Sequence, residues 1–175
     1  MTNSLPDILA KNLSVIFCGI NPGQTAATAG RHFVNRSNRF WRVLHLAGFT
    51  PEQILPENDR SILTYGYGLT TAVARPTRRA SDLSAEEFVL AASQLERKIA
   101  SLTPHSIAFL GKAAYATIAK NPDIQWGRQE IPFAGASVWV LPNPSGLNRN
   151  FSLDALVIAY RELRLAIAIP KKGGR

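Results

Sequence analysis

Residues 13–23, LSVIFCGINPG, form a short apolar run that ends abruptly in Gly-Ile-Asn-Pro-Gly. The part from Ser14 to Cys18 is apolar and partly β-branched, which predicts a strand buried on both faces. The glycines and the proline that follow predict a tight loop. Because ligands of open α/β sheets bind at the carboxyl ends of strands, this loop is the first place to look for a site.

Asn21 carries the one side chain of this pentapeptide that can make several directed hydrogen bonds. Gly19 and Gly23 flank it and permit close approach of a ligand. Asn21 is therefore the first candidate for chemistry. The alternative is an asparagine that only closes a turn, since asparagine, proline and glycine are ordinary turn residues.

The composition predicts one globular domain with a basic surface. The chain has 175 residues, of which 46% are hydrophobic and 18% are charged, and its 20 Lys+Arg against 12 Asp+Glu give a net charge of +8. This balance favours a polyanionic partner such as a nucleic acid, and a basic surface that serves only solubility is the alternative. We expect a single domain over residues 1–170 and a basic tail over 171–175.

Cys18 is the single cysteine of the chain, which excludes an internal disulfide and metal sites built on several cysteines. Its place in a buried strand favours an inert core thiol. No segment has the length of a membrane span or the pattern of a signal peptide. We expect a cytoplasmic protein with no membrane contact, no metal and no cofactor. The phosphate-binding patterns GxxxxGK[ST] and GxGxxG are also absent.

The alternation of apolar runs with helical patterns predicts the fold. Strands are expected at 14–18, 68–73, 107–110 and 137–141, the last as the second arm of a hairpin that begins at 126. Helices are expected at 5–13, 38–48, 51–55, 58–65, 84–101, 113–119 and 152–168, and residues 20–37 are expected to form a long loop. This order implies an α/β fold, a three-layer α/β/α sandwich around a mainly parallel four-stranded sheet.

A second Asn-Pro loop, Asn143-Pro-Ser-Gly, follows the strand at 137–141. Carboxyl ends of parallel strands meet at one edge of a sheet, so Asn21 and Asn143 are expected to flank a slot for something flat and polar, such as a nucleobase. The basic loop Arg75-Pro-Thr-Arg-Arg79 is expected at the same edge. It would contact phosphates there, or it would be a solvated charge cluster.

Five motifs stand out along the chain: GINPG at 19–23, NRFW at 38–41, RPT at 75–77, LGK at 110–112 and VLPNPSGLNR at 140–149. Together they resemble the mismatch-specific uracil-DNA glycosylases, the bacterial relatives of thymine-DNA glycosylase. The resemblance implies a monofunctional enzyme that flips uracil, and also ethenocytosine and weakly thymine, out of double-stranded DNA and hydrolyses the N-glycosidic bond. It further implies a preference for uracil opposite guanine, a monomer, and a bacterial, nucleoid-associated location.

The resemblance also implies roles for four residues that would handle the base. Asn21 matches the asparagine that holds the attacking water, and cleavage through an oxocarbenium-like state needs a positioned water more than a strong base. Phe33 matches the aromatic on which the flipped base stacks, and Ile20 belongs to the same base-binding set. Asn143 falls where the family approaches the uracil edge, so its amide would steady the charge on the leaving base.

Gly146, Leu147 and Arg149 match the family's wedge. Leu147 would enter the stack where the base left, and Arg149, with the backbone around Gly146, would meet the widowed guanine. The chain departs from the family pattern at Thr71, where the best-known bacterial member has a lysine. It also departs in the loop after Gly23 and in one extra residue within Asn150-Phe151.

Of the three histidines, none has a metal-ligand spacing, and His32, beside Phe33 in the long loop, is the candidate for touching DNA. Two functions of other classes stay open. One is a module of the same fold that binds damaged DNA or a nucleotide without cutting it. The other is a hydrolase of free nucleosides, against which the basic composition argues.

Overall fold

The computed structural model describes residues 4–119 and 121–168, so the expected tail at 171–175 lies outside the described residues. Its sheet has five strands in the order β2-β1-β3-β5-β4. The strands are β1 (Val15–Gly19), β2 (Tyr67–Thr71), β3 (Ser106–Leu110), β4 (Gly127–Arg128) and β5 (Ser137–Leu141). The four predicted strands are confirmed and are mutually parallel. The fifth, β4, lies within the predicted first arm of the hairpin and is antiparallel to β5.

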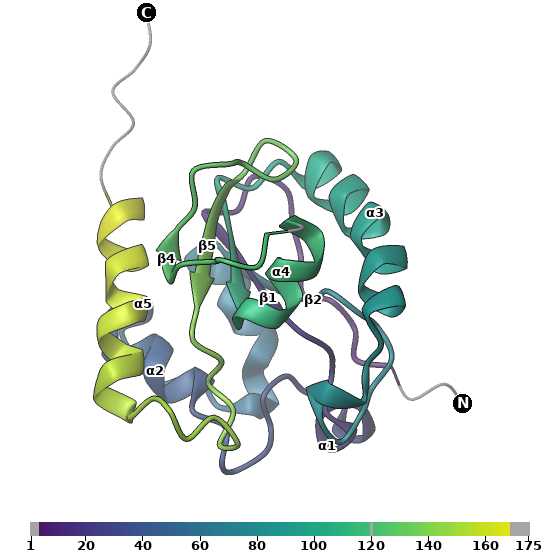
Figure 1. Cartoon of the computed structure of the whole chain (residues 1–175). Helices are drawn as coiled ribbons and strands as arrows, with labels where there is room; N and C mark the ends of the chain where they lie inside the picture. Colours follow the sequence, from purple (N-terminus) through teal and green to yellow (C-terminus); the bar gives the residue numbers. More distant parts are fainter. Residues whose placement is uncertain (1–3, 120, 169–175) are drawn as a thin grey trace, which may run out of the picture.

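Helices cover both faces of this sheet. They are α1 (Gln24–Ala29), α2 (Phe40–Leu46), α3 (Ala85–Leu102), α4 (Lys112–Ala119) and α5 (Leu153–Ile167), with 3-10 helices η1 (Pro56–Tyr65) and η2 (Ala80–Asp82). In Figure 1, α2 and α5 pack together on one side of the molecule, and α3 contacts α4 on the other. The predicted three-layer α/β/α sandwich is therefore confirmed.

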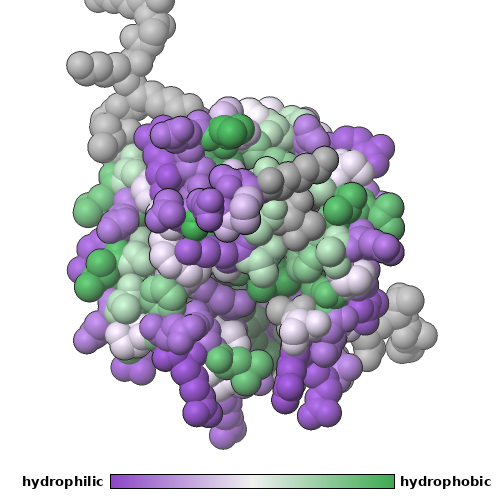
Figure 2. Space-filling view, in the orientation of Figure 1, coloured by the Kyte–Doolittle hydropathy of each residue, from purple (hydrophilic) through white to green (hydrophobic). Residues whose placement is uncertain are grey.

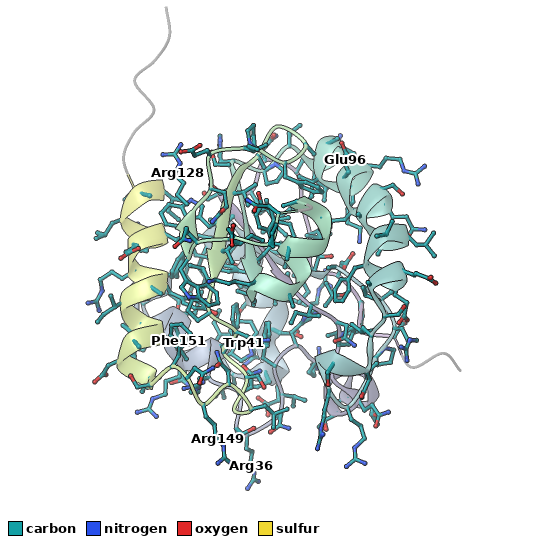
Figure 3. The ribbon with its side chains drawn as sticks, viewed as in Figure 1. Arg36, Trp41, Glu96, Arg128, Arg149 and Phe151 are labelled. Carbon is teal, nitrogen blue, oxygen red and sulfur yellow. The ribbon has the colours of Figure 1, made fainter. Side chains whose placement is uncertain are left out.

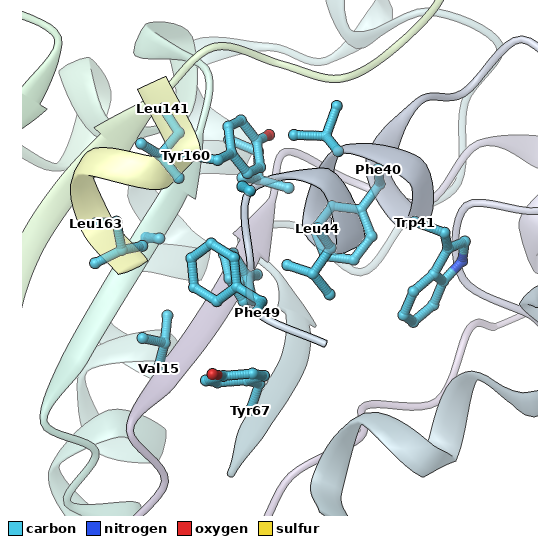
Figure 4. Close-up of a cluster of buried hydrophobic side chains, with 14 of the residues drawn as sticks. Val15, Phe40, Trp41, Leu44, Phe49, Tyr67, Leu141, Tyr160 and Leu163 are labelled. Carbon is cyan, nitrogen blue, oxygen red and sulfur yellow. The ribbon is translucent and has the colours of Figure 1, made fainter. Parts of the chain in front are cut away.

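The alternation of side chains along β1 explains the two layers of core. Val15 and Phe17 enter one apolar cluster with α2, α5 and η1, whereas Ile16 and Cys18 enter the other with α3 and α4. Figure 4 shows the first cluster, with Phe40 and Phe49 among its labelled rings. Phe17 meets both of these rings edge-on, each at 5.4 Å between centroids. Burial raises the pKa of the Cys18 thiol, in keeping with an inert core cysteine.

Tyr160 links this core to the sheet edge that carries the second Asn-Pro loop. Its ring is fully buried, and its hydroxyl donates a hydrogen bond of 2.9 Å to the carbonyl of Pro142. Burial raises the pKa of this hydroxyl, which therefore remains a neutral donor. A hydrogen bond from α5 thus anchors the segment that follows β5.

Three local predictions are wrong. Residues 5–13 form no helix, because Ile8 exchanges both backbone hydrogen bonds with Leu69, at 2.9 and 2.8 Å, along the outer side of β2. An edge strand leaves backbone groups unpaired, and this extended segment satisfies some of them. Residues 51–55 are not helical either. The expected loop at 20–37 contains α1, which ends at Gly30 with a φ of 64°.

No helix within the described ranges combines the length and the apolar character needed to cross a membrane.

Candidate active site

Three loops meet at the carboxyl edge of the sheet. Asn21 follows β1, Gly111 follows β3 and Asn143 follows β5, and β3 lies between the other two strands. The backbones of β1 and β5 are therefore about 10 Å apart, two interstrand spacings. The predicted meeting of the two Asn-Pro loops at one edge is confirmed.

Gly111 carries no side chain at the place where those loops meet. Its φ of 110° lies in the region that side chains rarely adopt. A Cβ at this position would lie 3.5 Å from Cδ1 of Ile20 and 3.8 Å from Cβ of Asn143. Ile20 and Asn143 thus border the same spot above β3, where Gly111 places no side chain.

Asn21 uses both of its N–H donors within the protein. Its Nδ2 donates to the carbonyl of Arg75 at 2.8 Å and to Oγ1 of Thr77 at 2.9 Å. A carbonyl oxygen can only accept, so the atom facing Arg75 must be the NH₂ group. Oδ1 has no hydrogen-bond partner among residues 4–119 and 121–168. Asn21 therefore offers a fixed acceptor to a ligand.

The basic loop at 75–79 holds Thr77 in place, and Thr77 in turn accepts a hydrogen bond from Asn21. The hydroxyl of Thr77 is buried and donates to the carbonyl of Arg79 at 2.6 Å, while its backbone N–H donates to Pro22 at 3.1 Å. Sequence analysis found the Arg-Pro-Thr motif but not this role of Thr77, because a contact between residues so far apart leaves no local signal. The predicted placement of the basic loop beside Asn21 is confirmed.

The loop is tied in turn to the start of α3. The guanidinium of Arg75 pairs with the carboxylate of Glu87 at 2.6 and 3.1 Å. Glu87 also forms a capping box with Ser84 at the start of α3. The hydrogen bonds from Arg75 and Ser84 lower the pKa of Glu87 to about 2. Arg75 therefore serves the protein itself, whereas Arg78 and Arg79 are exposed and free of such a pair within the described chain.

Asn143 uses the oxygen of its amide within the protein, whereas Asn21 uses the nitrogen. Its Oδ1 accepts from the backbone N–H of Ser145 at 3.0 Å, an Asx turn, so the remaining atom is the NH₂ group. That Nδ2 lies 4.0 Å from the position of a Cβ on Gly111 and has no hydrogen-bond partner in the described part of the chain. The site edge therefore presents one free acceptor, on Asn21, and one free pair of donors, on Asn143.

Phe33 is held in an unusual backbone conformation. Its φ is 54°, a left-handed value that costs an L residue of this size about 1–2 kcal/mol. The half-buried ring stacks on Phe40 with centroids 4.0 Å apart and an interplanar angle of 24°. Residues held in such strain cluster at binding sites, which suits a ring that serves as a platform.

His32, the neighbour of Phe33, is buried, which does not support the hypothesis that it touches DNA. Its side chain is 3% exposed, and Nε2 donates to the carbonyl of Pro6 at 2.7 Å. Its backbone N–H donates to Oδ2 of the buried Asp59 at 3.0 Å, and its carbonyl accepts from Nε1 of Trp41 at 3.0 Å. Burial lowers the pKa of His32, so the imidazole is buried in its neutral form.

This burial predicts a pH dependence of stability. The unfolded chain binds a proton on His32 near the usual pKa of 6.5, whereas the folded chain binds it only at lower pH. We expect the free energy of unfolding, measured with urea, to fall as pH decreases from 6.5 towards the lower folded-state pKa. His32→Gln, which keeps a donor for Pro6, should flatten this slope, and His45→Gln should keep it. Equal slopes in wild type and His32→Gln would refute the assignment.

The predicted wedge residues lie on one loop that projects from this edge. Leu147 is 73% exposed, and Arg149 and Arg36 both point away from the body at the same end of the molecule in Figure 3. Gly146 packs so closely on Ser37 that a Cβ would lie 2.6 Å from the Cβ of Ser37. Figure 2 shows hydrophilic side chains projecting on both sides of a hollow at this end of the molecule. Arg36 lacks any motif and was missed from the sequence.

Thr71, the departure from the family pattern, lies at the end of β2 in register with Gly19. A Cβ on Gly19 would lie 3.7 Å from its methyl group. It is a short neutral side chain at the rim of the site and supplies no charge there.

The sequence of this chain matches the family model "Uracil DNA glycosylase superfamily" over residues 6–164. The chain belongs to this superfamily. It is also similar to a solution NMR structure from Methanosarcina acetivorans described as "a putative Uracil DNA glycosylase". The two share 21% sequence identity with a TM-score of 0.61, over 92% of this chain and 97% of the other. That likeness supports the fold, and membership of the superfamily supports a DNA-repair glycosylase.

Proposed function

We propose that this superfamily member is a monofunctional glycosylase of the mismatch-specific branch. It excises uracil from G·U-type mismatches in double-stranded DNA and leaves an abasic site. Ethenocytosine and, weakly, thymine are further proposed substrates. The observation that carries the proposal is the pair of oppositely used amides, the free acceptor of Asn21 and the free donors of Asn143, on either side of Gly111.

Hydrolysis of the glycosidic bond needs a water on the sugar and a stabilised leaving base. Oδ1 of Asn21 accepts one hydrogen bond from the water and so holds its oxygen towards C1′. As the C1′–N1 bond breaks, its electron pair passes to the base, and the water oxygen bonds to C1′. The proton of the water passes to solvent, because an amide is too weak a base to retain it.

The base leaves as an anion, and the donors of Asn143 face the site in which its charge develops. The ring of Phe33, supported by Phe40, is the proposed stacking surface for the extruded base. Ile20, which lies with Asn143 beside Gly111, is a further proposed contact of the base. Leu147 is proposed to fill the vacated stack and Arg149 to contact the widowed guanine. A monomer suffices, since one chain supplies all these groups.

Thr77→Val is expected to lower the single-turnover rate of uracil excision about fivefold, because Asn21 loses one of two bonds worth roughly 1 kcal/mol each. Thr77→Ser keeps the hydroxyl and should remain near the wild-type rate. Urea unfolding of both variants checks that the protein stays folded. A Thr77→Val variant as fast as the wild type would show that this bond does not orient Asn21.

The proposed function is tested by incubating the protein with EDTA and end-labelled duplexes that carry G·U, A·U, G·T, ethenocytosine·G or G·C. Hot alkali then reveals abasic sites. We expect cleavage at G·U well above A·U and none at G·C, with no release of uracil from free deoxyuridine. Binding should weaken steeply with salt, as for proteins that displace counterions from phosphates.

Folded protein that binds these duplexes and produces no abasic site would refute the proposed activity in favour of a damage-recognition module. Release of uracil from free deoxyuridine, with binding indifferent to salt, would instead indicate a nucleoside hydrolase.

A further inference from the structure

Arg39 directs its whole guanidinium at the loop that carries Asn143 and the wedge residues. Nη1 donates to the carbonyl of Phe151 at 2.6 Å, and Nη2 donates to those of Ser145 and Asn148 at 3.1 and 3.0 Å. Nε donates to Pro144 at 3.4 Å, and the backbone N–H of Arg39 reaches the same carbonyl at 3.0 Å. Four carbonyls of residues 144–151 therefore converge on one side chain.

Only an arginine can hold a loop in this way. Its planar fork carries five N–H donors in fixed directions, whereas lysine presents a single point charge. Arg39 is half-buried and directs four of its five side-chain N–H groups at carbonyls, so its guanidinium serves this loop first, despite the basic composition of the chain. Its charge is balanced by carbonyl dipoles alone, since no acidic side chain pairs with it within the described residues.

Hydrogen bonds between residues of the loop itself add to those from Arg39. Asn148 donates from Nδ2 to the carbonyl of Asn143 at 2.9 Å and from its backbone to Ser145 at 3.0 Å, and Leu147 donates from its backbone to Oγ of Ser145 at 3.2 Å. The carbonyls face inward, and the apolar side chain of Leu147 is left at the exposed tip. The ends of the segment are anchored separately, by Tyr160 on Pro142 and by the cap of Ser152. Arg39 therefore determines the part in between.

We propose that Arg39 is a positioning residue that holds loop 143–151 in its DNA-inserting shape before DNA binds. The proposal rests on the proposed glycosylase function for its DNA part. Ordering a loop at the moment of binding costs free energy, and a loop ordered in advance avoids that cost. The saving in free energy matters most in the step in which Leu147 displaces a paired base. In that step Leu147 must keep its position against the resistance of the stacked duplex.

The test compares Arg39→Lys with Arg42→Lys, a matched change on an exposed arginine three residues along the chain. Hydrogen exchange is measured first, without DNA. We expect the amides of Leu147 and Asn148 to exchange at least about tenfold faster in Arg39→Lys, with the sheet amides unchanged, because local opening of the loop is then less costly. Unchanged loop exchange would overturn the proposal whatever the enzyme does.

Single-turnover excision is then measured on two duplexes, with uracil opposite guanine and with uracil opposite an abasic spacer. The spacer duplex has no partner base from which uracil must be parted. Arg39→Lys should lose at least about tenfold on G·U and markedly less on the spacer duplex, whereas Arg42→Lys should match the wild type on both. Equal losses on both duplexes would show a general effect on the fold and overturn the proposal.

Two further outcomes are separable. If the wild type excises no uracil from either duplex, the proposed function fails, while the exchange measurement still decides whether Arg39 orders the loop. If Arg39→Lys does not fold, Gly146→Ala displaces the same loop from Ser37 and is measured on the same pair of duplexes. It should show the same selective loss on G·U, and an equal loss on both would overturn the proposal.

Discussion

Asn21→Ala is expected to lower the single-turnover rate of uracil excision from a G·U duplex between about a hundredfold and a thousandfold. Alanine removes Oδ1, the acceptor that would hold the attacking water, and with it the two bonds that orient the group. Binding to a duplex with an abasic-site analogue should change little, because the wedge loop is untouched. Quench-flow or manual sampling with alkaline strand cleavage measures the rate.

Asn58→Ala, a change on an exposed asparagine of η1, is the matched control and should keep the wild-type rate. Asn21→Asp sharpens the test. A carboxylate cannot donate to the carbonyl of Arg75, which lies 2.8 Å from Nδ2 in the wild type, so the aspartate loses the orientation that makes Asn21 useful. Its rate at neutral pH should not exceed that of the wild type. An Asn21→Ala enzyme within threefold of the wild type would rule out Asn21 as the water-holding group.

Asn143→Asp is the second change with a large expected effect, a loss of about a hundredfold or more in excision at neutral pH. The carboxylate still accepts from the N–H of Ser145, so the Asx turn of the loop survives. What disappears is the donor that faces the leaving base, and a negative charge takes its place. The loss of excision rate therefore measures how much Asn143 stabilises the departing anion, separately from its role in the shape of the loop.

The pH profile distinguishes this cause from a structural one. Protonation returns a donor to Asp at position 143, so the rate of Asn143→Asp, relative to wild type, should rise as the pH falls towards the carboxyl range. Asn121→Asp is the control, because Asn121 is exposed and makes the same type of turn, with Oδ1 accepting from Asp123 at 3.0 Å. A constant ratio of variant to wild type at all pH values would argue that Asn143 acts only through the loop.

The errors of sequence-based prediction share a physical cause. The helix expected over 5–13 is an extended segment because the partner of Ile8 is Leu69, an edge residue far along the chain. The short α1 was missed because it buries a single residue, Ala27, and so shows no apolar period. His32 looked like a loop residue available to DNA, yet its neighbours Pro6 and Asp59 bury and bond it.

Local sequence determined the parts of this protein that depend on neighbours in the chain. These are the four parallel strands, the start of α3 at Ser84 and the two Asn-Pro loops, because periodicity, capping and turn chemistry act over a few residues. Parallel strand order then places Asn21 and Asn143 at one edge. The way in which Asn21 uses its amide was decided only by the tertiary structure, and so was the support of the loop that follows Asn143. Arg75 and Thr77 take the donors of Asn21, and Arg39 gathers the loop that follows Asn143. Those partners lie more than fifty residues away, and hydrogen bonds at such separations form only once the sheet has brought the loops together.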